Sequence, residues 1–177
     1  YSVNQHHIST FLAFVRDGQI AIPEVQRPFV WDSSKVRDLL DSLYKGYPIG
    51  YVITWQNPNV RLKDGKMSEG KKILIDGQQR ITALKASILG DYVINKEYDR
   101  VRIKIAFNPL TESFEVQNPA ILKDKSWIPD VSEVMNSGSI IQVVRQYLEL
   151  NEQADAATVE RNISNLLSIQ HKQVGTI

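Results

Sequence analysis

Residues 73–84 contain the side chains with the clearest chemical potential in this chain. The apolar run Ile73–Ile75 has the character of a strand, Asp76-Gly77 interrupts it, and an amphipathic helical pattern begins directly afterwards. At a helix start the first backbone N–H groups lack partners within the helix, and the helix dipole favours negative charge. Anions such as phosphate bind at such positions, so the spacing predicts an anion site at a strand-to-helix turn.

Each residue of this turn offers a different contribution to such a site. Gly77 allows the backbone to approach a ligand closely, Arg80 supplies a fork of cationic donors, and Asp76 can hold a metal ion or orient water. The plainer alternative is structural. In that alternative Asp76 caps the helix, Gly77 makes the turn and Arg80 is a solvated helix residue.

A second Gln-Arg pair, Gln26-Arg27, occurs beside another strand-like run and leads into a predicted helix. Pro23 and Pro28 flank this pair and hold its loop extended, which positions the Arg27 side chain in advance. Two aromatic residues follow, so Arg27 could stack or make a bidentate contact with phosphate or carboxylate. The alternative is a surface arginine that covers a hydrophobic plug. Two such pairs at the edges of core elements suggest one pocket that is built from both.

Together these segments resemble a known family. Ile22–Trp31 and Ile75–Thr82, with Leu39–Leu43 and Gly46–Gly50 between them, are similar to the N-terminal domain of GmrSD-type, modification-dependent restriction systems. That family is related to the ParB/sulfiredoxin superfamily, and the resemblance is clear across roughly residues 8–107. It implies a domain that binds and hydrolyses nucleoside triphosphates and regulates a DNA-cleaving partner domain.

The resemblance places the nucleotide site at Asp76–Arg80, and phosphoryl transfer relies mainly on positioning and charge stabilisation. We expect Mg²⁺, bound with the nucleoside triphosphate, to be held by Asp76, with Glu24 and Asp32 as further carboxylates in reach. The residues expected to take part in catalysis are Asp76, Gln78, Gln79 and Arg80. The residues expected to bind the nucleotide or its phosphates are Gln26, Arg27, Gly77, Arg80 and Thr82.

A DNA-binding sensor of modified DNA, without nucleotide turnover, is the competing hypothesis. The net charge is only +1, but residues 1–110 carry 16 Lys and Arg against 11 Asp and Glu, whereas residues 111–177 carry 5 against 9. Weak nucleic-acid contacts are predicted on the turn before the motif, at Lys63, Lys66, Lys71 and Lys72. A protein-interaction scaffold with a purely structural motif is the third hypothesis.

The amino-acid composition argues against several classes of protein and of cofactor site. With 42% apolar and 23% charged residues in 177, the composition is that of an ordinary globular domain, and no apolar run approaches a membrane span. There is no cysteine, His6 and His7 are adjacent rather than spaced as ligands, and no P-loop occurs, so we expect no zinc, haem or flavin and no ordinary P-loop enzyme. We expect a cytoplasmic protein, a nuclease-type domain beyond residue 177, contact with DNA through the full-length protein, and compatibility with a homodimer.

The elements that must position the motif alternate between helix and strand, so the predicted class is α+β. The family resemblance implies a ParB/sulfiredoxin-like small mixed sheet with packed helices, followed by a C-terminal helical segment. A soft boundary near residue 136 divides a nucleotide-binding domain, 1–136, from a helical extension, 137–177. Helices are predicted at Ile8–Val15, Ser33–Tyr44, Ile81–Ile88, Val131–Met135, Ile140–Leu150 and Ala156–Gln170. Strands are predicted at Gln19–Ile22, Tyr51–Trp55, Val60–Leu62, Ile73–Ile75, Val101–Ile105 and Phe114–Val116.

Overall fold

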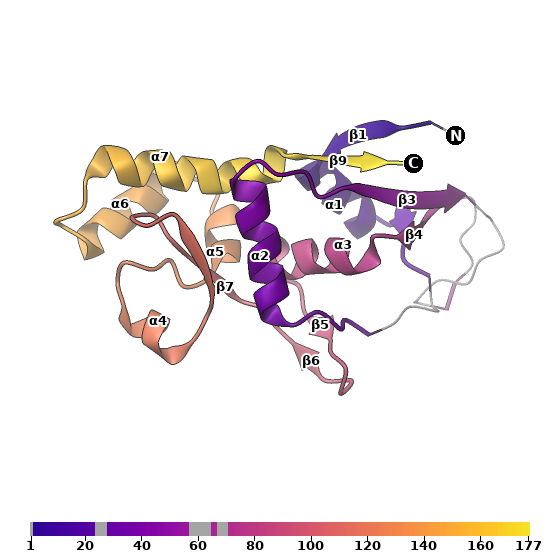
Figure 1. The fold of residues 1–177 in the computed structure, drawn as a ribbon, viewed down its shortest axis with the longest axis horizontal. Coiled ribbons are helices and arrows are strands. Elements are labelled where there is room, and N and C mark those ends of the chain that lie inside the picture. Colours follow the sequence, from indigo (N-terminus) through magenta and orange to yellow (C-terminus); the bar gives the residue numbers. More distant parts are fainter. Residues whose placement is uncertain (1, 24–27, 57–64, 67–70) are drawn as a thin grey trace.

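A computed structural model describes residues 2–23, 28–56, 65–66 and 71–177. Within these ranges the chain forms a five-stranded mixed sheet, two small two-stranded sheets and a set of helices, which confirms the predicted α+β class. The sheet occupies one end of an elongated molecule, and helices α6 and α7 occupy the other (Figure 1). The relation to the ParB/sulfiredoxin superfamily stays a prediction.

The large sheet has the order β1-β9-β3-β4-β2. Its strands are β1 (Asn4–His7), β9 (Gln173–Thr176), β3 (Tyr51–Gln56), β4 (Lys72–Asp76) and β2 (Ile20–Ala21). β3 is antiparallel to β4, and its other edge pairs in parallel with β9. From the sequence, Val60–Leu62 rather than Tyr51–Gln56 was expected to pair with Ile73–Ile75, but Val60–Leu62 lies outside the described residues. The two ends of the chain therefore lie side by side in neighbouring strands (Figure 1).

One face of the large sheet is buried and the other is partly open. In β3, Val52 is fully buried, whereas Tyr51 and Trp55 are 51% and 50% exposed on the opposite face. The register of β3 with β4 shifts between Ile53 and Thr54, because Ile53 faces Asp76 and Thr54 faces Leu74. This irregularity leaves one extra residue, Ile75, at the end of β4, directly before the turn that carries the motif.

The predicted N-terminal helices form where the apolar periodicity places them. They are α1 (Ile8–Arg16), α2 (Ser33–Tyr44) and α3 (Gln78–Leu84), and α3 continues through one π-helical stretch, Lys85–Leu89, to Gly90. Asp32 caps α2, since its carboxylate accepts hydrogen bonds from Ser34 Oγ and Lys35 N. These two bonds, the one from Ser34 first, hold the pKa of Asp32 below its usual value. This carboxylate, a candidate for Mg²⁺ on sequence grounds, is thus used as a cap.

The middle of the chain corrects one predicted strand. Instead of a continuous strand over Val101–Ile105, the structure has β6 (Arg100–Val101) and β7 (Ile105–Asn108), which pair with different partners. β6 pairs with β5 (Val93–Ile94), and β7 pairs with β8 (Ser113–Val116), as predicted for Phe114–Val116. Arg102 lies between the two strands and donates to Asp130 and Ser132, so the chain bends away from β5 at this point.

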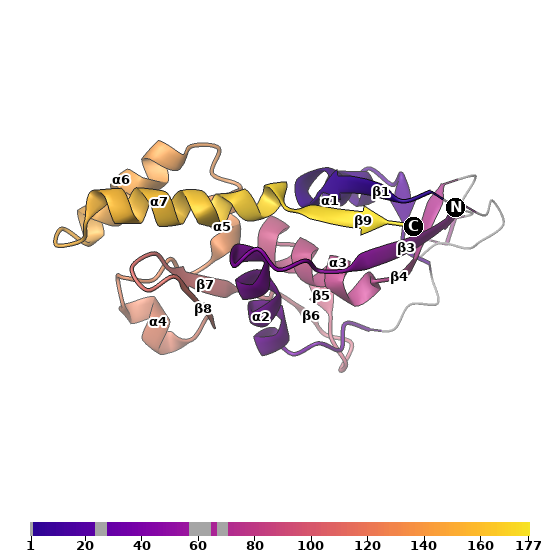
Figure 2. The ribbon, with the colours of Figure 1, turned by 45° about the horizontal axis from the view of Figure 1, so that its top comes forward.

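The last third of the chain is helical until it returns to the large sheet. The helices are α4 (Pro119–Lys123), α5 (Val131–Met135), α6 (Ile140–Leu150) and α7 (Ala156–Leu167), and a 3₁₀ turn at Ser168–His171 follows. The predicted helix over Ala156–Gln170 is therefore shorter, and β9 was not predicted. Figure 2 shows β9 alongside β3, which means that residues beyond 136 supply an interior strand of the sheet. The soft boundary near residue 136 stays a prediction.

Gly175 in β9 has a packing role that can be tested. A Cβ atom built on Gly175 would lie 2.5 Å from the Cδ1 and Cε1 atoms of Tyr51, so the tyrosine ring covers the glycine. We expect Gly175→Ala to lower the free energy of unfolding by about 1–3 kcal/mol through overpacking. In a Tyr51→Ala background the same substitution should cost much less. Denaturant unfolding of the four proteins of this cycle measures the coupling, and equal losses in both backgrounds would contradict the predicted contact.

Candidate functional site

The turn between β4 and α3 requires glycine at position 77. Gly77 has φ +87°, in the left-handed region that side chains other than glycine rarely adopt. A Cβ atom there would also lie 2.6 Å from Cγ1 of the buried Val52. The chain thus passes from strand to helix through a backbone conformation and a close approach that together exclude larger residues.

The start of α3 carries no side-chain cap. Gly77 is the N-cap residue, so Asp76 does not cap the helix, and the plainer alternative for this residue does not hold. The helical bond from Ile81 N to Gly77 O is the first of the helix, which leaves the N–H groups of residues 78–80 without helical acceptors. The Asp76 carboxylate is exposed and has no hydrogen bond or ion pair to any residue that the structure describes. Open donors and an unpaired carboxylate therefore lie next to each other.

The two glutamines of the motif bind main-chain groups. Gln78 Nε2 donates to Leu74 O at 2.7 Å and so ties the helix start to β4. Gln79 Oε1 accepts from Val30 N at 3.0 Å, and Gln79 Nε2 donates to Pro28 O at 3.3 Å. In this arrangement both amides position neighbouring segments. The predicted role of these glutamines in orienting water stays a prediction.

Arg80 spans the turn and the loop before β3. Its guanidinium donates to Ile49 O and, at 2.9 Å, to Tyr51 O. The Nη2 atom also lies 3.3 Å from the position that a Cβ of Gly77 would occupy, so the positive charge is directly beside the turn. Arg80 is therefore not simply a solvated helix residue. It orders the start of β3 and places a cation at the candidate anion site.

The residues that directly follow the second predicted segment contact helix α3. Gln26, Arg27 and Glu24 lie outside the described residues. Pro28 and Val30, which follow them, are bound to Gln79, and Phe29 N donates to Ile94 O at 3.0 Å. Phe29 is 5% exposed, which fits a packing role. The segment after Arg27 is thus fixed against α3, although the positions of the two predicted ligands themselves remain predictions.

A cavity of about 350 Å³ opens beside the exposed side of α3. Gln79, Thr82 and Lys85 form its helical wall, and the segment around Phe29 forms a second wall. The third wall is the β5–β6 hairpin, with Tyr92 and Tyr98 at 54% and 76% exposure. Sequence reasoning missed both tyrosines. Their only signal was the placement of exposed aromatic residues at the two ends of a short polar turn.

Two of the predicted basic residues, Lys71 and Lys72, line a different cavity. Lys66, Lys71 and Lys72 are exposed, and Lys63 lies outside the described residues. Lys71 and Lys72 line a separate cavity of about 380 Å³, together with residues of β1, α1 and β3 such as His6, Phe14 and Thr54. Two of the four predicted contacts are therefore brought together at one cavity, which is lined by residues from all five strands of the large sheet.

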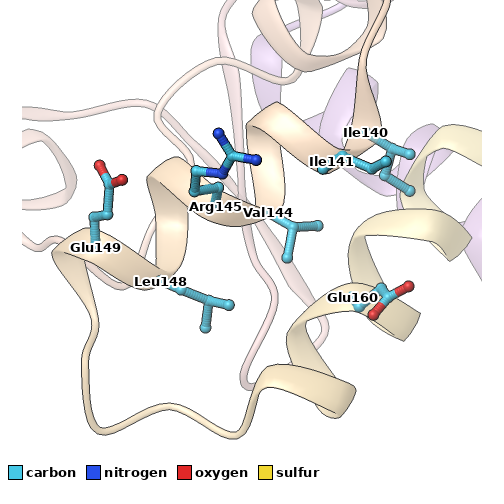
Figure 3. Close-up of a pocket in the computed structure, with 7 residues that line it drawn as sticks. All are labelled: Ile140, Ile141, Val144, Arg145, Leu148, Glu149 and Glu160. Carbon is cyan, nitrogen blue, oxygen red and sulfur yellow. The ribbon is translucent and has the colours of Figure 1, made fainter.

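Another cavity, of about 500 Å³, is remote from the motif. It lies along α6 where that helix faces α7, and Figure 3 shows Val144 and Leu148 directed into it. Ile141, Val144 and Leu148 form an apolar helix side that, from the sequence, either packs on the sheet domain or leads into a following helical domain. Ile141 is 70% exposed. Arg145, Glu149 and Glu160 supply the charged part of the lining. Nothing in its chemistry connects this apolar groove with the anion site.

Metal binding at the motif depends on one carboxylate. Among the described residues no group of three or more His, Cys, Asp or Glu side chains gathers in metal-binding geometry. Mg²⁺ bound with a nucleotide takes most of its ligands from phosphates and water and needs only one or two carboxylates. The exposed and unpaired Asp76 fits such a contact. In the part of the chain that the structure describes, no helix is both long and apolar enough to cross a bilayer.

Comparison with known proteins now gives the fold and site a family. The model of the family described as GmrSD restriction endonuclease, N-terminal domain, matches residues 8–175. The chain belongs to this family. It is also 28% identical over 87 residues to an uncharacterized protein of Methanocaldococcus jannaschii, and this match covers 38% of the chain and 14% of the relative. The matched region thus spans about a seventh of the curated relative's length.

The steric requirement at Gly77 predicts a graded stability loss. Gly46 provides a matched control, because it has the same φ of +87° but no atom within 4 Å of the position that a Cβ would occupy. We expect Gly46→Ala to cost about 1–2 kcal/mol for the left-handed conformation alone. Gly77→Ala should cost about 1–3 kcal/mol more, because it also overpacks against Val52. Urea unfolding measures both losses, and equal losses would show that the Val52 contact is unimportant.

Arg80 is predicted to stabilise the fold through its two carbonyl contacts. Arg80→Lys keeps the charge but cannot bridge Ile49 O and Tyr51 O, so we expect a loss of about 1.5–3 kcal/mol in unfolding free energy. Arg37 is the control, since it forms exposed ion pairs with Asp38 and Glu115 that are worth about 0–1 kcal/mol. Thermal and denaturant unfolding compare the two. A loss at Arg80 no larger than that of Arg37→Lys would rule out the bridging role.

Proposed function

We propose that this domain binds a nucleoside triphosphate with Mg²⁺ at Asp76–Arg80, hydrolyses it, and thereby regulates a DNA restriction protein. The observation that carries the proposal is the uncapped turn at Gly77. There, open N–H groups of residues 78–80 lie beside the unpaired carboxylate of Asp76 and the guanidinium of Arg80. Membership of the GmrSD N-terminal family supports the restriction context.

The chemistry follows from these groups. The backbone N–H groups and Arg80 would neutralise phosphate oxygens, while Asp76 would hold Mg²⁺ or position the attacking water. Gln78 and Gln79 would keep the turn, β4 and the segment after Arg27 in register. Gln26 and Arg27 would add phosphate contacts from that segment. Such a site accelerates phosphoryl transfer by positioning and charge stabilisation rather than by covalent chemistry.

Under this proposal, DNA cleavage is carried out by another part of the protein. The family name describes a restriction endonuclease whose N-terminal domain matches this chain, so DNA cleavage would come from a separate nuclease domain. Nucleotide turnover here would control that domain, and DNA would be engaged by the full-length protein in the cytoplasm. The proposal extends to the ParB/sulfiredoxin-like relation of the fold.

Nucleotide titration tests the proposal directly. We expect calorimetry to detect binding of GTP, CTP, UTP or ATP in the presence of Mg²⁺. Asp76→Asn should weaken binding by about 10- to 100-fold, because a charged contact of roughly 1.5–3 kcal/mol is lost. Glu152→Gln, an exposed charge change in the loop between α6 and α7, should leave the affinity unchanged. Phosphate release under the same conditions measures hydrolysis.

If the folded wild-type protein binds no nucleotide, the proposal that this domain has a nucleotide site of its own is wrong. Binding that survives Asp76→Asn and also survives removal of Mg²⁺ would place the nucleotide elsewhere. Circular dichroism of each variant establishes that the fold is intact.

DNA sensing is the second candidate, because Lys71 and Lys72 are both exposed and line one cavity on the large sheet. Phosphate contacts by lysines make affinity fall with salt. If this function holds, Lys71→Gln with Lys72→Gln should weaken DNA binding about equally for all sequences and reduce its salt dependence, whereas Asp76→Asn should not. Gel-shift titrations at two salt concentrations measure this. Unaltered DNA affinity in the double variant would eliminate these lysines as contacts.

A further inference from the structure

The cavity between α3 and the β5–β6 hairpin has the composition of a small-molecule site. Its volume of about 350 Å³ falls at the lower end of the range for ligand pockets, about 300–1,000 Å³. Phe29 and Val93 give it an apolar floor, and Tyr92 and Tyr98 stand at its rim. We propose that this cavity binds the base and ribose of the nucleotide whose phosphates bind at the Gly77 turn. The inference rests on the proposed function and names the part of the site that selects the nucleoside.

The cavity is aligned with the phosphate site because both use α3. Gln79, Thr82 and Lys85 follow one another at three-residue spacing and so share one side of the helical stretch. With a rise of about 1.5 Å per residue, Thr82 lies roughly 7 Å along the helix from Gly77. A nucleotide whose phosphates bind at the helix start can therefore extend its ribose and base along this side.

The walls of the cavity are tied to one another, so the site exists before a ligand arrives. Gln79 binds the main chain at Pro28 and Val30, which fixes the second wall to α3. Phe29 N donates to Ile94 O at 3.0 Å, which fixes the same wall to β5. Preformed walls reduce the entropy that binding must overcome.

The polar groups at the rim suit a nucleobase. The hydroxyls of Thr82, Tyr92 and Tyr98 have no hydrogen-bond partner among the described residues, and a hydroxyl both donates and accepts. The Tyr92 ring is braced by Arg100, whose Cζ lies 4.1 Å from the ring centroid. Aromatic rings bind bases by stacking, and free hydroxyls can read the base edge or the ribose.

Lys85 adds a charge at the far end of the helical wall. Its Nζ lies 3.8 Å from Asp91 Oδ2, so the charge is only loosely paired within the protein. Lysine on this wall favours a base edge rich in carbonyl oxygens, such as those of guanine or uracil, over the amino edge of adenine. Which nucleoside triphosphate binds best is therefore measured directly in the titrations below.

The experiment compares wild-type protein and cavity variants with GTP, UTP, ATP and inorganic triphosphate, all with Mg²⁺, by calorimetry. Ile94→Trp should fill the cavity and Tyr98→Ala should remove a stacking partner. We expect each variant to lose about tenfold or more in affinity for the preferred nucleotide while binding inorganic triphosphate as wild type does. Thr10→Val, on the exposed side of α1, and Tyr47→Ala, an exposed tyrosine outside the cavity, are the controls and should change neither affinity.

The possible failures of the two proposals differ. If wild type binds nucleotides and inorganic triphosphate equally, or if both cavity variants keep full nucleotide affinity, the base lies elsewhere and the phosphate site stands. If neither nucleotide nor triphosphate binds folded wild type, the phosphate site fails and the base site with it. Thermal unfolding of both variants checks that they fold, and Tyr98→Ala, whose side chain is 76% exposed, keeps the test decisive if Ile94→Trp does not fold.

Discussion

The left-handed turn at Gly77 is the constraint on which the surrounding structure depends. It starts α3 at a fixed angle to β4, and the next three side chains then bind main-chain groups of three other segments. Gln78 reaches β4, Gln79 reaches the chain after Arg27, and Arg80 reaches the start of β3. One short motif therefore organises the sheet edge, the candidate phosphate site and a wall of the neighbouring cavity. A substitution here disturbs fold and function together, so matched controls are needed to separate them.

Local sequence patterns predicted the elements whose stability is mostly local. α2 and α6 begin and end as expected, since each has an amphipathic period and a capping residue, Asp32 or Ser139. β1 and β9 were missed because Asn4–His7 and Gln173–Thr176 are short and mostly polar. Their stability comes from pairing across the length of the chain, for which a local window carries no signal. The exposed Ile141 shows the converse, because an amphipathic pattern does not say whether a partner covers the apolar side.

The site shows the same division. Gly77 and the strand-to-helix turn could be predicted from the sequence, because glycine between a strand pattern and a helix pattern has few structural explanations. The hydrogen-bond partners of the two glutamines and of Arg80 could not be predicted. They are main-chain groups, which occur at every residue and have no sequence signature. Tyr92 and Tyr98 approach α3 only through the β5–β6 hairpin, a long-range placement. The resemblance to the GmrSD family supplied the proposed function, which residue types alone left among three classes.

The position of β9 has a consequence for biosynthesis. Thr176 and Asn4, 172 residues apart in sequence, meet in adjacent strands, and β9 separates β1 from β3. During translation the edge of β3 that β9 will cover stays unpaired until Gln173–Thr176 leave the ribosome, although α1, α2 and α3 are already available. Such non-local pairing folds slowly and leaves an open strand edge that other chains can bind. The nascent domain is therefore most exposed to aggregation just before β9 emerges.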